Sequence, residues 1–77
     1  MQFNEAVALV VRHLRRDHNI SQEKLAELIN SHQVYICEIE QGKKLPSLTV
    51  LNNIAKAFNL PLSQLVYQIE VKLEEGK

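Results

Sequence analysis

A run of polar side chains between positions 33 and 41 falls on one face when this stretch is drawn as a helix. The face lies opposite Ile36 and Ile39, which are apolar residues at helical spacing. Glutamine can pair with adenine through two hydrogen bonds, glutamate can accept one from the cytosine amino group, and valine can contact the thymine methyl group. Composition by itself favours a plainer interpretation, an ordinary solvated face. The residues on this face are Gln33, Val34, Cys37, Glu38 and Gln41.

The other reactive side chains form no arrangement that is typical of catalysis or metal binding. His13, His18 and His32 are too scattered for a pair of metal ligands on one helix, and the sequence has no glycine-rich phosphate loop. The single cysteine excludes an internal disulfide and any site built from several cysteines. A chain without disulfides suits a reducing cytoplasm. We therefore expect a cytoplasmic protein with no enzyme activity, no cofactor, no metal and no small-molecule ligand.

Two short helices joined by a tight turn are predicted to position the polar face. Ser21 can cap the first helix, because its hydroxyl can accept a hydrogen bond from a backbone amide of the first turn. Asn30 tolerates the left-handed conformation that a sharp exit requires, and either Ser31 or His32 can begin the second helix. Two helices at this spacing, over about residues 21–42, form a helix–turn–helix unit. The second helix of such a unit enters the major groove of DNA.

Three further helices are predicted around this unit. Asn4 is the expected N-cap of the first, and Ser47 of the one that follows the helix–turn–helix. Leu48 is expected to face the core from the start of that helix. Pro61 suits the first turn of the last helix, where its missing amide proton costs nothing. The three helices are expected over about residues 3–18, 48–58 and 61–73.

The composition indicates one small all-α domain over residues 1–77. Two glycines and two prolines argue against a turn-rich β fold, and a 45% hydrophobic content with few aromatic residues fits an aliphatic helical core. No apolar run approaches the roughly 20 residues that a membrane-spanning helix needs, so no membrane association is expected. The formal net charge is zero, which counts against a purely electrostatic nucleic-acid binder.

Four strings occur in order along the chain: Gln22-x-x-Leu25-Ala26, Tyr35-Ile36-x-x-Ile39-Glu40-x-Gly42, Pro46-Ser47 and Ile54-Ala55-Lys56-Ala57-Phe58. This ordered set resembles the Cro/phage-repressor (XRE-type) helix–turn–helix family. The resemblance covers roughly residues 7–66 without an insertion, and it implies a five-helix lambda-repressor-like DNA-binding domain. Two positions depart from the family pattern. Ser31 stands where a small apolar turn residue is usual, and Glu38 stands where a basic or neutral polar side chain is commoner.

The resemblance implies a role for each polar residue of the predicted DNA-facing surface. Gln33, Val34 and Glu38 take positions that family members use for base edges, and Cys37 is expected to be a small residue of the groove wall. Gln22 begins the helix that crosses the DNA backbone, where its amide would contact a phosphate and could brace Gln33. The predicted phosphate contacts are Gln22, Gln41, Lys43 and Lys44.

Arg15 and Glu40 stand where the family places a structural ion pair between the first helix and the recognition helix. Arginine suits this role, because its planar guanidinium group can hold a carboxylate through two hydrogen bonds. The alternative is that these are two unrelated surface charges.

The last predicted helix carries more apolar surface than one small core can cover. We therefore expect a two-fold symmetric homodimer, which would also supply the paired reading helices that a palindromic operator requires. The residues predicted to form this interface are Leu62, Leu65, Val66 and Ile69.

These inferences together predict a sequence-specific transcription regulator that binds double-stranded DNA. The resemblance to compact family members implies a restriction–modification controller or a phage-type repressor. An antitoxin that represses its own operon is one alternative. A protein-interaction module that has lost DNA binding is another, and the zero net charge and Glu38 favour it.

Overall fold

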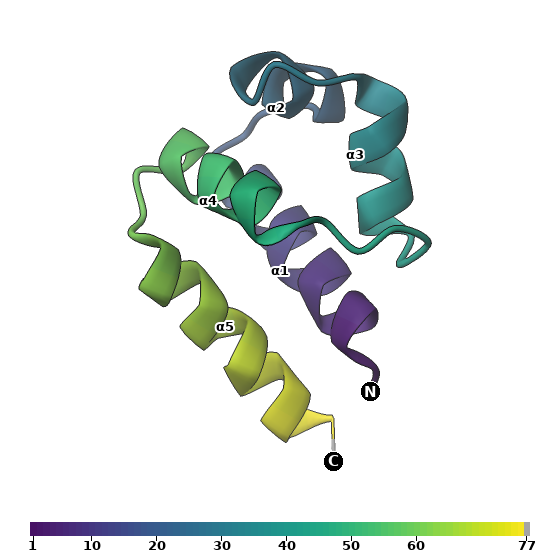
Figure 1. The fold of residues 1–77 in the computed structure, drawn as a ribbon, viewed down its shortest axis with the longest axis vertical. Coiled ribbons are helices and arrows are strands. Elements are labelled where there is room, and N and C mark those ends of the chain that lie inside the picture. The colour runs from purple at the N-terminus through teal and green to yellow at the C-terminus, as the bar shows by residue number, and fades with distance from the viewer. Residues whose placement is uncertain (77) are drawn as a thin grey trace.

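Five α-helices make up most of residues 1–76, the part of the chain that the computed structural model describes (Figure 1). The all-α, five-helix prediction is therefore confirmed, and each helix lies within a few residues of its expected place. The helices are α1 (Phe3–Asp17), α2 (Gln22–Leu28), α3 (Gln33–Glu40), α4 (Leu48–Ala57) and α5 (Leu62–Glu75).

Local capping chemistry determines where the helices begin and turn. The Ser21 hydroxyl accepts a hydrogen bond from the Lys24 amide at 3.0 Å, and the Ser47 hydroxyl accepts one from the Val50 amide at 3.2 Å, as predicted. Asn30 adopts a φ of 56°, which gives the sharp exit from α2. His32 rather than Ser31 is the N-cap of α3, which settles the open choice between them.

Three local predictions were wrong. Gln2, not Asn4, is the N-cap of α1, and its backbone amide donates to the Glu5 carboxylate at 3.2 Å. Pro61 is the N-cap of α5 and so lies one position before the first turn. Leu48 is exposed, because it lies one turn before the stretch of α4 that packs on the core.

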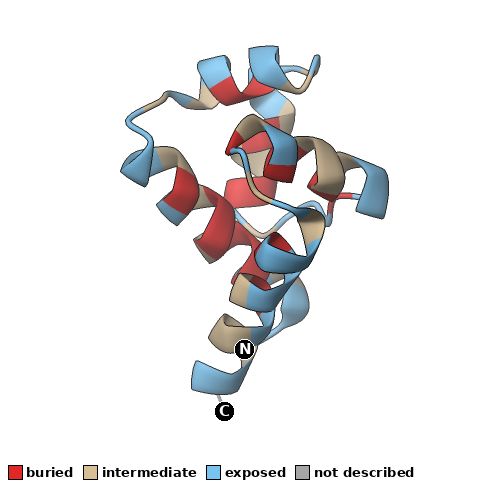
Figure 2. Cartoon of the chain, turned by 90° about the vertical axis from the view of Figure 1, so that its left-hand side faces the viewer, coloured by how far each residue is buried: buried red, intermediate tan, exposed pale blue. Residues whose placement is uncertain are grey.

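Helix α1 lies at the centre of the core and packs against both α3 and α5. In Figure 1, α5 runs antiparallel alongside α1, so the two described ends of the chain lie near each other. Figure 2 shows the buried residues gathered where the helices face one another, with exposed residues on their outer sides. Among residues 1–76, no helix combines the length and apolar content that crossing a membrane requires.

The inner side of α5 is used by the chain's own core. Leu65 and Ile69 are 0% and 1% exposed, because α5 lies along α1 and α1 covers these two side chains. These two residues therefore have almost no side-chain surface for a second chain, contrary to the role in a dimer that was predicted for them. Leu62 is half-buried and Val66 is 41% exposed, so of the four predicted interface residues these two retain accessible surface.

Candidate nucleic-acid interface

Helix α3 is anchored to the core by one face and leaves the opposite face accessible. Ile36 and Ile39 are completely buried beneath it. Tyr35 packs against the core, while Val34 is 65% exposed. Gln33, Val34 and Gln41 are exposed, and Cys37 and Glu38 are half-buried. The five residues of the predicted polar face therefore lie together on the accessible side of α3.

A buried ion pair joins α3 to α1. Arg15 Nε donates to Glu40 Oε2 at 2.7 Å, and Arg15 Nη2 donates to Glu40 Oε1 at 3.0 Å. Arg15 Nη1 also donates to the Ile20 carbonyl at 3.0 Å, so the guanidinium group is held on two sides. The hydrogen bond to Glu40 raises the pKa of Arg15 above its ordinary value. The structure thus contains the ion pair at the positions that the resemblance indicated, and Glu40 is only 5% exposed.

Two glutamines extend this ion pair to the accessible surface. Gln22 Nε2 donates to Glu40 Oε1 at 3.1 Å. Gln33 Nε2 in turn donates to Gln22 Oε1 at 2.6 Å, which is the bracing contact expected between these side chains. A continuous series of hydrogen bonds therefore runs from Arg15 through Glu40 and Gln22 to Gln33. It holds an exposed side chain in one place before any ligand binds, which lowers the entropy that binding would cost.

The loop after α3 places two lysines beside the same surface. Gly42 adopts a φ of 75°, a left-handed conformation that favours glycine. The backbone amides of Lys43 and Lys44 then donate to the Glu38 carbonyl at 2.9 and 3.3 Å, and both lysine side chains are exposed. On α3 itself, Gln41 Nε2 donates to Cys37 Sγ at 3.4 Å.

Sequence reasoning missed one residue that supports this loop. The Asn4 side-chain amide donates to the Gly42 carbonyl, which ties the first turn of α1 to the end of α3. Asn4 had been interpreted as a cap because asparagine is common at that position, and its partner lies 38 residues away, so no local pattern could have indicated the contact. The hydrogen bond from Gln22 to Glu40 was missed for the same reason.

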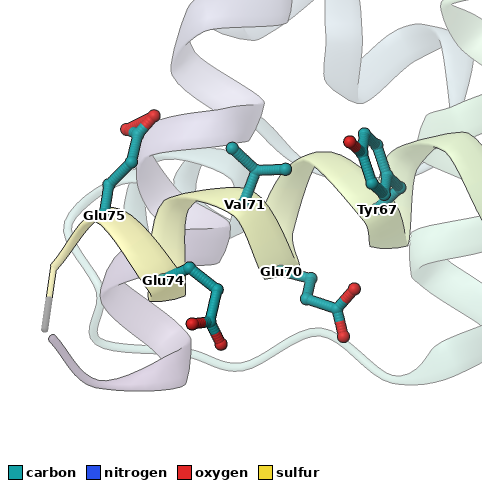
Figure 3. Close-up of a pocket in the computed structure, with 5 residues that line it drawn as sticks. All are labelled: Tyr67, Glu70, Val71, Glu74 and Glu75. Carbon is teal, nitrogen blue, oxygen red and sulfur yellow. The ribbon is translucent and has the colours of Figure 1, made fainter.

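The far end of α5 has a different chemical character. Figure 3 shows a groove lined by Tyr67 and Val71 together with the carboxylates of Glu70, Glu74 and Glu75. This acidic lining makes the groove less suited to a phosphate backbone than the accessible face of α3. No cluster of three or more histidine, cysteine or acidic side chains within residues 1–76 could hold a metal ion.

Comparison with known proteins identifies the family. The model of the helix–turn–helix family HTH_3 matches residues 11–65, which is most of the chain. The chain belongs to this helix–turn–helix family. The match spans α2 and α3, the two helices of the predicted helix–turn–helix unit.

Two relatives and one solved structure resemble this HTH_3 chain over most of their own length. The control protein C.SmaI of Serratia marcescens is 36% identical over 76 residues, which cover 99% of this chain and 90% of that protein. The ImmF control region 10 kDa protein of Bacillus phage phi105 is 32% identical over 68 residues, covering 87% and 74%. The restriction–modification controller protein C.Esp1396I, solved as a tetramer with its natural 35-base-pair operator, shares the fold with a TM-score of 0.75. Its sequence is 23% identical, with 90% of this chain and 96% of that chain covered.

These findings establish a general function. The chain is a DNA-binding transcription regulator of the HTH_3 family and not an enzyme.

Proposed function

We propose that this chain is a sequence-specific regulator of the restriction–modification controller or phage-repressor kind, which binds a palindromic operator as a homodimer in the cytoplasm. The observation that carries the proposal is the hydrogen-bonded series that ends at Gln33. An exposed glutamine would ordinarily sample several rotamers, whereas this one is held by Gln22, which is held in turn by the buried Glu40. A side chain fixed at an exposed surface is suited to reading a base edge.

In the proposed complex, α3 enters the major groove with its accessible face toward the bases. Gln33 is suited to adenine, Val34 to the thymine methyl group, and Glu38 to the cytosine amino group, while Cys37 packs against the groove wall. Glu38 is the most selective of these, because phosphates repel a carboxylate that does not meet a donor. This face combines donors, an acceptor and a methyl group, which favours sequence reading over general attraction to DNA.

The proposed phosphate contacts surround this face. Gln22 uses one amide hydrogen for Glu40, which leaves the second free to donate to a phosphate at the start of α2. Gln41 likewise retains one amide hydrogen beyond its contact with Cys37. Lys43 and Lys44 add two exposed positive charges at the other end of α3. Contacts at both ends of a recognition helix would fix its register in the groove without themselves selecting a sequence.

The homodimer is proposed to form through the outer side of α5. Val66 and Tyr67 are exposed apolar side chains on this helix, and the half-buried Leu62 lies one turn earlier. A two-fold contact would bring each residue of this patch against the same patch of the partner. We therefore retain Leu62 and Val66 from the sequence prediction, add Tyr67, and assign Leu65 and Ile69 to the core of each chain.

Selection of bound duplexes from a random DNA pool tests the proposed function. We expect enrichment of an inverted repeat whose half-sites lie about one helical turn, or a multiple of it, apart. The matched control is a variant with Gln33, Val34 and Glu38 all changed to alanine, which should bind the pool without enriching this repeat. A native chain that enriches no common sequence would contradict the proposal and favour an interaction module.

A further inference from the structure

We infer that Glu40, although enclosed on the inward side of α3, sets the base preference of Gln33 by fixing which way two side-chain amides face. The inference rests on the proposed reading of DNA by α3 and adds to it a positioning residue that touches no base. It depends on the direction of each hydrogen bond in the series, and not merely on the presence of these bonds.

The Glu40 carboxylate determines the donor and the acceptor in each hydrogen bond of the series. Arg15 holds Glu40 through two hydrogen bonds at 2.7 and 3.0 Å, in which both carboxylate oxygens accept from the guanidinium group. An ionised carboxylate can accept hydrogen bonds but cannot donate one. The group of Gln22 that lies 3.1 Å from Glu40 Oε1 must therefore be the amide nitrogen. Turning this amide around would place two acceptor oxygens against each other in a nearly dry site, which is strongly unfavourable.

The orientation of the Gln22 amide in turn fixes the orientation of the Gln33 amide. With its nitrogen directed at Glu40, Gln22 directs its oxygen at Gln33. Gln33 must then give an amide hydrogen to Gln22, across the 2.6 Å that separates these two atoms. What remains for the groove is the Gln33 oxygen, a hydrogen-bond acceptor, together with the second amide hydrogen.

The remaining pair of groups matches adenine. Adenine presents an amino donor and the N7 acceptor in the major groove, whereas guanine presents two acceptors, N7 and O6. A fixed Gln33 oxygen would therefore be satisfied by adenine and would oppose an acceptor of guanine. If Gln33 were free to turn, its amide nitrogen could instead serve the guanine acceptors. A fixed amide is expected to favour adenine by about 5- to 150-fold, the value of one good bidentate contact.

Two variants change the direction of the series in different ways. Gln22→Lys places an ammonium group, which can donate hydrogen bonds but cannot accept them, between Glu40 and Gln33. The Gln33 oxygen must then turn inward and its nitrogen must face the groove. Glu40→Gln replaces the acceptor-only carboxylate by an amide that can offer either atom, so neither orientation of Gln22 is imposed. The matched control is Glu23→Gln, which removes an exposed carboxylate next to Gln22 in the sequence and lies outside the series.

The experiment measures the dissociation constant of each variant for four operators that differ at one base pair. That base pair is the one at which Gln33→Ala loses discrimination in the native context. The readout is the ratio of affinities for adenine and guanine on one protein preparation, which is independent of the folded fraction. It therefore separates a change of preference from the loss of stability expected for Glu40→Gln.

The native chain and Glu23→Gln should prefer adenine to the same degree. Glu40→Gln should bring the ratio to within about threefold of one, and Gln22→Lys should move the preference to guanine through tighter binding of the guanine operator. The inference is overturned if Gln33→Ala loses discrimination but both series variants keep the native ratio, or if the native chain prefers guanine at that position. If Gln33→Ala loses discrimination at no base pair, the proposed reading by α3 fails, and the inference fails with it.

Discussion

The two ends of the molecule hold their charged side chains in different ways. At the end formed by α2 and α3, Arg15 and Glu40 pair at 2.7 Å with side chains only 15% and 4% exposed. At the free end of α5, Lys72 and Glu75 pair at 3.4 Å with side chains 29% and 58% exposed. Water competes for the second pair and is nearly absent from the first. The comparison suggests that polar contacts determine geometry at the DNA-facing end, while apolar packing holds α5.

The largest expected effect is at the enclosed pair. Arg15→Ala strands the Glu40 carboxylate in a site with almost no water, and should lower the free energy of unfolding by about 3–5 kcal/mol. Urea unfolding of Arg15→Ala, Glu40→Ala and the double variant measures the coupling between the two. We expect the double variant to lose much less than the sum of the single losses. Small and additive losses would mean that the enclosed pair behaves like an exposed one.

An intermediate effect is expected on the outer side of α5. Val66→Glu places like charges against each other across the proposed two-fold contact, and should weaken the dimer by at least about tenfold, or 1.4 kcal/mol. Sedimentation at micromolar concentration should show a dimer for the native chain and a shift toward monomer for the variant. The control is Leu28→Glu, which charges an exposed leucine on α2 and should leave assembly unchanged. A native chain that sediments as a monomer would contradict the proposed dimer.

The smallest effect is expected at the exposed pair. Lys72→Ala should change the free energy of unfolding by less than about 1 kcal/mol, because solvent screens the attraction to Glu75. The same urea titration that tests Arg15→Ala measures this change. A loss comparable to that of Arg15→Ala would remove the distinction between the two ends.

Features that depend on neighbours in the sequence were predictable. Ser21, Ser47 and Asn30 act within a few residues of their own positions, so their chemistry indicates the start of α2, the start of α4 and the turn. The helical spacing also placed Gln33 and Val34 on the face opposite Ile36. For these elements the sequence carries nearly all of the required information.

Features that depend on how helices pack were not predictable from local patterns. Periodicity put Leu65 and Ile69 on one stripe of α5, but the width of the surface that α1 covers decided that both belong to the core. The Arg15–Glu40 pair was located only through the family resemblance, because its members are 25 residues apart. The direction of the amide in Gln22 depends on that pair, so it became visible only in three dimensions.

The most direct test of the central claim, that α3 reads DNA through Gln33, is a titration at several salt concentrations. Native chain, Gln33→Ala and Lys43→Ala are each titrated against the selected operator and a scrambled duplex. Gln33→Ala should lose about 1–3 kcal/mol on the operator and almost nothing on the scrambled duplex. Lys43→Ala should weaken both and reduce the salt dependence by about one unit. An unchanged ratio of operator to scrambled affinity in Gln33→Ala would contradict the claim.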